Sequence, residues 1–159
     1  MRKNEVIVNS TPIIALREIG RLDILRELYG SVTIPDAVFR EVTAKDIHAL
    51  GGYPWIVVKN VENIAAKEVF STALHDGEVE VMLLARETGA KLVIMDDGLA
   101  RRHAKYFSLS ITGTVGVLLR AKQEGFIDKV KPALDELIIN DFYISSSVCN
   151  EILRLAGEL

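Results

Sequence analysis

The stretch that most constrains the fold is Lys91–Gly98, KLVIMDDG. Four consecutive apolar residues, Leu92–Met95, lead directly into two aspartates and a glycine. A short apolar run that is closed by glycine predicts a strand buried on both faces, as in a parallel sheet. In parallel α/β sheets, ligands and catalytic groups gather at the carboxyl ends of the strands. Asp96 and Asp97 are therefore predicted to lie where a metal or phosphate site would be built.

Strand and helix patterns alternate along the first two thirds of the chain. Short apolar runs predict strands at 6–8, 32–34, 55–58, 91–95 and 109–112. Caps, glycine stops and apolar periodicity predict helices at 12–19, 21–29, 35–42, 62–70, 75–88, 99–107, 113–124, 131–139 and 147–155. This alternation predicts an α/β fold in which helices cover both faces of a mainly parallel sheet of four or five strands. We expect a single domain over residues 1–159, with a helical C-terminal part from about 130 to 159.

Composition narrows the class of protein. The chain of 159 residues is 49% apolar and 26% charged, which is typical of a folded, soluble domain. No apolar stretch approaches the roughly 20 residues that span a bilayer, and the start of the chain lacks the apolar region of a secretion signal. Cys149 is the only cysteine, which excludes an internal disulfide and a cysteine metal cluster and suggests a cytoplasmic protein. A net charge of −3 excludes a general nucleic-acid coat, but not a nuclease whose metal neutralises the phosphate.

Two glutamates fall on helices in line with apolar residues. Glu41 shares a helix face with Val38, and Glu78 shares one with Val81 and Met82. On such faces a carboxylate needs a cationic partner, which would be a divalent metal or an Arg or Lys side chain. A structural ion pair explains either glutamate alone about as well.

The set of polar residues favours a metal site over these separate explanations. Asn9 ends the first predicted strand, and Asp96 and Asp97 end the later one. An aspartate before glycine is also ordinary turn chemistry, so the pair alone decides little. Together with the two glutamates, however, these residues offer the oxygen ligands that Mg²⁺ and Mn²⁺ prefer.

Taken together, these segments resemble the PIN-domain ribonucleases, and more narrowly a PIN-like branch related to VapC-type toxins of toxin–antitoxin pairs. The resemblance rests on the first strand with its Asn-Ser-Thr end, on TIPDAVFREV, on LHDGEVEVMLLARETGAKLVIMDDGLARR and on ITGTVGVLLRAK. It covers nearly the whole chain. It implies a three-layer α/β/α sandwich with the first strand beside the strand that carries the late aspartates. It also implies an endoribonuclease that uses Mg²⁺ or Mn²⁺, a homodimer and a small antitoxin partner.

The resemblance also implies where the site lies, at the first strand's end, on two helices and after the late strand. The implied metal ligands are Asn9, Glu41, Glu78, Asp96 and Asp97. The four acids of that set, Glu41, Glu78, Asp96 and Asp97, are the implied catalytic residues.

Contacts with RNA are expected from residues that follow the first and the last of these ligands in the sequence. Thr11 follows the first ligand and would orient a phosphate oxygen, although a residue directly before Pro12 is first of all expected to cap a helix. Arg101, Arg102 and Lys105 follow the aspartates and would hold the RNA backbone. An ordinary solvated helix face is the alternative for these three residues.

The sequence departs from the family's pattern at Asn9, where an acid is expected. An amide oxygen can bind a metal but brings no charge, so metal affinity should fall. The first hypothesis is therefore a metal-dependent ribonuclease that resembles a type II toxin. The second is a PIN-like binding module that does not cut. A receiver-type phosphoacceptor ranks third. Its acidic pair should come early in the chain, whereas here the pair, Asp96 and Asp97, comes late.

Overall fold

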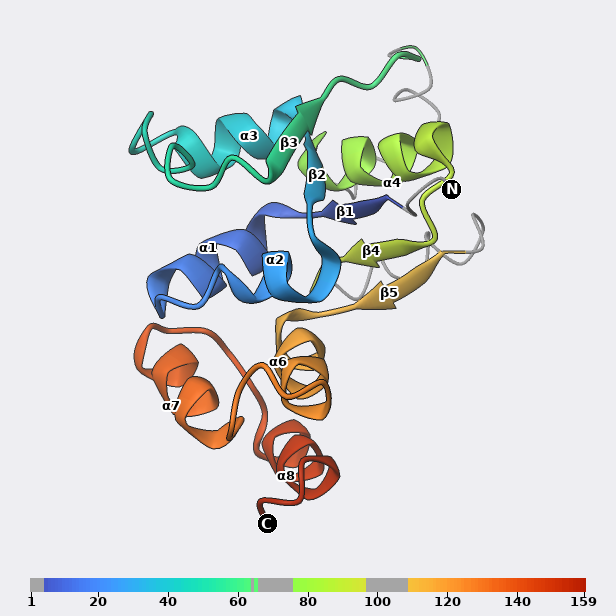
Figure 1. Cartoon of the computed structure of the whole chain (residues 1–159). Helices are drawn as coiled ribbons and strands as arrows, with labels where there is room; N and C mark the ends of the chain where they lie inside the picture. Colours follow the sequence, from blue (N-terminus) through green and yellow to red (C-terminus); the bar gives the residue numbers. More distant parts are fainter. Residues whose placement is uncertain (1–4, 64, 66–75, 97–108) are drawn as a thin grey trace.

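The computed structural model describes residues 5–63, 65, 76–96 and 109–159. Its strands are β1 (Val6–Val8), β2 (Val32–Pro35), β3 (Ile56–Lys59), β4 (Leu92–Ile94) and β5 (Ser110–Thr112). The helices within these ranges are α1 (Ser10–Glu18), α2 (Ile24–Tyr29), α3 (Asp36–Thr43), α4 (Asp76–Thr88), α6 (Thr114–Gln123), α7 (Lys131–Ile139) and α8 (Ser146–Leu155) (Figure 1).

The strands form one parallel sheet in the order β3-β2-β1-β4-β5. Ile7 of β1 lies in register with Thr33 of β2 on one side and with Val93 of β4 on the other. The strand order therefore reverses at β1, and ligands of such sheets bind beyond the carboxyl ends at this switch point. The Asn9 N–H donates to the Ile94 carbonyl at 2.9 Å, so the residues that follow β1 and β4 leave the sheet next to one another.

Helices cover the sheet as the sequence predicted. α4 packs against β1, β2 and β4 and also against α3, while α6 packs against α1, α2 and α8. Figure 1 shows α6, α7 and α8 as a helical group below the sheet. This is the α/β/α arrangement of a PIN-like sandwich. None of the described helices has both the length and the apolar character that a membrane crossing requires.

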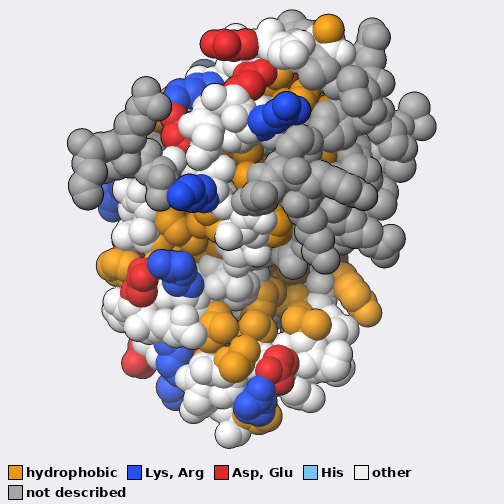
Figure 2. Space-filling view, turned by 90° about the vertical axis from the view of Figure 1, so that its right-hand side faces the viewer, with side chains coloured by type: hydrophobic (Ala, Val, Ile, Leu, Met, Phe, Trp, Pro, Cys, Tyr) orange, Lys and Arg blue, Asp and Glu red, His pale blue; other side chains and the backbone are white. Residues whose placement is uncertain are grey.

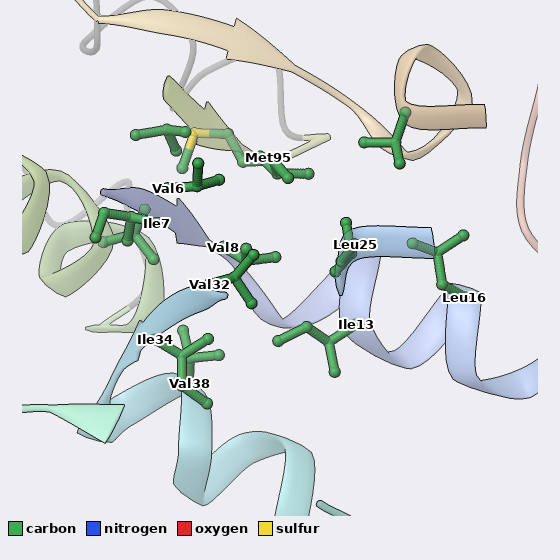
Figure 3. Packing of buried hydrophobic residues seen from close by; sticks show 14 of the residues in the cluster. Val6, Ile7, Val8, Ile13, Leu16, Leu25, Val32, Ile34, Val38 and Met95 are labelled. Atoms are coloured by element: carbon green, nitrogen blue, oxygen red, sulfur yellow. The ribbon is translucent and has the colours of Figure 1, made fainter. Parts of the chain in front are cut away.

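The core explains why the two central strands, β1 and β4, are apolar throughout. Val6, Ile7 and Val8 are all buried, so β1 has no solvent face. Figure 3 shows Val8 of β1 beside Val32 of β2 in this core. Val38 of α3 lies beside Ile34 of β2. The same reasoning predicted the buried run of β4 correctly.

The first helix begins at Ser10, two residues before the predicted start at Pro12. Asn9 keeps an extended backbone (φ −79°, ψ 168°) and occupies the N-cap position, so Ser10 and Thr11 are already helical. The prediction that Thr11 caps the helix is therefore wrong. Pro12 remains acceptable because the first N–H groups of a helix have no partner within the helix.

Other boundaries also differ by one to three residues. The helix predicted over 21–29 is confirmed only from Ile24, and the strand predicted over 55–58 lies one residue later. The helices predicted over 75–88, 131–139 and 147–155 are confirmed to within one residue at each end. The predicted helix over 99–107 lies outside the described residues, as does almost all of the one over 62–70.

Candidate functional site

Asn9 occupies the N-cap of α1 but does not act as a cap. Its side chain is 5% exposed and makes no hydrogen bond to the first turn of the helix, although an asparagine at this position normally does. The extended backbone of Asn9 thus holds its side chain at the end of β1 without engaging it in the cap of α1.

Glu41 reaches the same place from α3. A Cβ atom built on Gly77 would lie 3.7 Å from Asn9 Oδ1 and 3.4 Å from Glu41 Oε2. An amide oxygen and a carboxylate oxygen, from two elements far apart in the sequence, therefore border one small space at the start of α4. Two predicted ligands are thus brought together beyond the carboxyl end of β1.

The environment of Glu41 differs from the prediction. Its neighbours Ala37, Val38 and Val42 are buried, but Glu41 itself is exposed, so its placement on an unsolvated face is wrong. The short helix buries one face against its neighbours, and Glu41 lies at the border of that face, beside Val38 Cγ2, which lies 3.7 Å from the same Gly77 Cβ position. Exposure makes the carboxylate accessible to a ligand from solvent.

Glu78 follows Gly77 in the first turn of α4 and is 8% exposed, which confirms its predicted burial. It has interactions in the folded chain, so its charge is not isolated. Its sequence position next to Gly77 places its backbone at the candidate site.

Glu80 is a buried acid that the sequence reasoning missed. It is 6% exposed, and its Oε1 accepts a hydrogen bond from the Ala37 N–H at 3.2 Å. Its Oε2 lies 4.0 Å from an Arg40 guanidinium nitrogen. Glu80 thereby satisfies a free N–H at the start of α3 and joins α4 to the helix that carries Glu41. A glutamate between Val79 and Val81 in a largely apolar helix was the available signal.

Asp96 is bound to the start of α6. Its Oδ1 accepts from the Thr114 N–H at 2.9 Å, and its Oδ2 accepts from the Thr114 hydroxyl at 2.8 Å. Thr114 is fully buried, so this pair fixes the end of β4 against α6. The metal and catalytic roles of Asp96 stay predictions. Asp97, Arg101, Arg102 and Lys105 lie outside the described residues, whereas Thr11 is exposed in the first turn of α1.

The donors around Gly77 suit a hard divalent cation. Amide and carboxylate oxygens are the ligands that Mg²⁺ and Mn²⁺ prefer, and the space between them is one that a single methyl group would fill. Within the described residues, no three His, Cys, Asp or Glu side chains lie close enough to hold a metal by themselves. The predicted set also includes Asp97, the residue directly after Asp96.

A second hollow lies on the α8 side of Asp96. Its volume is about 530 Å³, and its lining includes Ile111, Phe142, Tyr143 and Val148. Figure 2 shows apolar side chains gathered over the lower part of this face, where the C-terminal helices lie. The sequence reasoning did not predict this hollow, because its walls come from β5, α6, α8 and the link that precedes α8.

Comparison with known proteins agrees with the geometry. A family model described as PIN domain matches residues 5–158. No curated protein and no solved structure matches the chain. The PIN domain is a nuclease-type fold, and its members generally use divalent metal ions. With its five-stranded parallel sheet and with oxygen donors at the switch point, the chain belongs to the PIN-domain family.

Proposed function

We propose that the chain is a metal-dependent endoribonuclease that hydrolyses phosphodiester bonds of RNA at the space in front of Gly77. The observation that carries this proposal is the approach of Asn9 Oδ1 and Glu41 Oε2 to the same Gly77 position. This place lies beyond the carboxyl ends of the strands, beside the switch point between β1 and β4. The PIN-domain membership supports the reaction class.

The ion would be held by oxygen atoms from the strand ends and two helices. The proposed ligands are Asn9, Glu41, Glu78 and Asp97, with Asp96 contributing beside them. Bound there, Mg²⁺ or Mn²⁺ neutralises charge on the scissile phosphate and lowers the pKa of the attacking water.

The chain's own residues position these ligands and the RNA. Glu80 holds α3 through the Ala37 N–H and thereby fixes the helix of Glu41. Asp96 ties the end of β4 to Thr114, which fixes the backbone directly before Asp97. In this proposal Thr11 orients a phosphate oxygen from the first turn of α1.

The RNA backbone would be held by cationic side chains after the aspartates. We propose Arg101, Arg102 and Lys105 for this role, since guanidinium and ammonium groups bind phosphates without reading the sequence. Their removal should weaken binding of all RNAs alike and reduce the salt dependence of binding.

The second candidate is a PIN-like module that binds without cutting, and the neutral amide of Asn9 favours it. The Asn9→Asp variant separates the two functions. In a working nuclease, the added carboxylate should tighten Mn²⁺ binding and raise the cleavage rate. In a binding module, cleavage should stay at the level of the buffer control.

The test is cleavage of a panel of single-stranded and structured RNAs in Mn²⁺ or Mg²⁺, with EDTA as the metal-free control. Glu41→Gln and Asp97→Asn should abolish cutting. Glu18→Gln is the matched control for Glu41→Gln, because Glu18 is also an exposed helical glutamate. It lies at the C-terminal end of α1, whereas Asn9 lies at the N-terminal end. Cutting that persists in EDTA, or in folded Glu41→Gln, would refute the proposal.

We further propose that the chain is a single cytoplasmic PIN-like domain that acts as the toxin of a type II pair, as a homodimer that a small antitoxin inhibits. The exposed apolar residues of the C-terminal part support a protein contact: Tyr143 is 87% exposed, Val148 46% and Leu155 52%. Sedimentation of the purified chain tests the dimer. A monomer at all accessible concentrations would contradict it.

A further inference from the structure

Among the described residues, neither the backbone of Gly77 nor its neighbours require a glycine. It lies in α4 and is absent from the glycines of the described chain that have a positive φ, so its backbone suits any L-residue. A methyl group there would stand at 3.4–3.7 Å from its nearest neighbours, which is ordinary van der Waals contact. Within a helix, alanine is more stabilising than glycine. Backbone strain and packing therefore both permit alanine at position 77.

Two other glycines of the chain show what is different about Gly77. At Gly116, a Cβ atom would lie 2.3 Å from Thr112 Oγ1, so a side chain there would force Thr112 or α6 to move. At Gly52, a Cβ atom would meet no atom of the described residues within 4 Å. Gly77 resembles neither, because the atoms that border its missing side chain include two oxygens of the candidate site.

We propose that the lack of a side chain at Gly77 is what allows the site to take a divalent cation. It keeps the space between Asn9 Oδ1 and Glu41 Oε2 open for the cation and the cation's remaining oxygen ligands. This inference rests on the proposed function. Mg²⁺ and Mn²⁺ need oxygen atoms on every side, and Mg²⁺ usually keeps several of its waters. A methyl group in contact with both protein oxygens occupies such positions and offers no ligand in return.

The inference predicts that one methyl group has opposite effects on stability and on metal binding. We expect Gly77→Ala, measured in EDTA, to melt at the same temperature as the wild type or roughly 1–4 °C higher. We expect its Mn²⁺ affinity, measured by titration calorimetry on the full chain, to fall about 10–100-fold, the range for residues that surround metal ligands. Gly52→Ala is the matched control and should leave Mn²⁺ affinity unchanged.

Three outcomes would overturn the inference, and they are distinguishable. If the wild type binds Mn²⁺ and Gly77→Ala binds it equally well, the space is not used by the cation, and the nuclease proposal stands. If Gly77→Ala melts lower than the wild type in EDTA, the glycine serves packing. If the wild type itself neither binds Mn²⁺ nor cuts RNA, the proposed function fails and the inference fails with it.

Discussion

Glu158 offers the most quantitative test of how this chain uses buried acids. Its carboxylate accepts hydrogen bonds from the Val130 N–H at 2.8 Å, the Lys131 N–H at 3.0 Å and Lys122 Nζ at 3.0 Å. The side chain is 8% exposed. It therefore joins the end of the chain to α6 and satisfies the backbone at the start of α7, where an anion is favoured.

The pKa of Glu158 gives the size of the effect. Burial by itself would raise this pKa, but the two backbone hydrogen bonds and Lys122 outweigh burial and lower it from 4.5 to about 2. At about 1.4 kcal/mol per pKa unit, the fall from 4.5 to about 2 is worth at most about 3.5 kcal/mol of stability, and solvent screening near the chain end reduces it to about 2 kcal/mol. Because the folded pKa is lowered, this stability is fully present above about pH 4.5 and is lost as the pH falls through 2.

The perturbation is Glu158→Gln, followed by urea unfolding at pH 7 and at pH 3. We expect the variant to lose about 2 kcal/mol at pH 7, or roughly 4–8 °C in melting temperature, because the amide keeps the shape but not the charge. At pH 3 the difference between variant and wild type should shrink by more than half. Glu18→Gln should match the wild type at both pH values.

Two results would refute this reasoning. Equal stability of variant and wild type at pH 7 would mean that the carboxylate contributes nothing beyond its solvation. A loss that is the same at pH 3 as at pH 7 would mean that packing, and not the charge, holds the end of the chain.

Three further substitutions test the contacts around the site. Asp96→Ala should cost about 2–3 kcal/mol in urea unfolding, because the buried Thr114 loses the acceptor of two hydrogen bonds; a loss below 0.5 kcal/mol would contradict this. Gly116→Ala should lower stability by roughly 1–3 kcal/mol, and adding Thr112→Ala should recover part of that loss. If the losses of the two substitutions simply add, the side chains at the two positions do not clash. Glu80→Gln should lower stability by about 1 kcal/mol and weaken Mn²⁺ binding. Calorimetry that finds unchanged Mn²⁺ binding would show that Glu80 does not fix the position of Glu41.

Much of the fold follows from the sequence because its signals are local. The apolar run of β4 and the alternation of strands and helices predicted a parallel sheet, and the sheet is confirmed. Helix starts were harder to place. The rule that proline favours the first turn put the start of α1 at Pro12, but the turn also holds Ser10 and Thr11, because Asn9 takes the N-cap position.

The site was less predictable because its contacts are not local. Glu80 bonds to Ala37, 43 residues away, and Asp96 bonds to Thr114, 18 residues away. Neither the helical period nor the alternation of a strand in the sequence indicates hydrogen bonds between residues so far apart. The exposure of Glu41 was not predicted for the same reason. Which face of α3 is buried depends on how α3 packs on its neighbours.

The acids of this chain fall into two groups with different physical roles. Asp96, Glu80 and Glu158 each accept hydrogen bonds from the first turn of a helix, where unpaired N–H groups favour a negative charge. Their removal should first reduce stability. Glu41 instead faces Gly77 together with the amide of Asn9, so its removal should leave stability nearly unchanged and reduce metal affinity. An acid-rich strand end therefore identifies a metal site only when the hydrogen bonds that its carboxylates make to helix starts are known as well. Paired measurements of unfolding and Mn²⁺ binding distinguish the two roles.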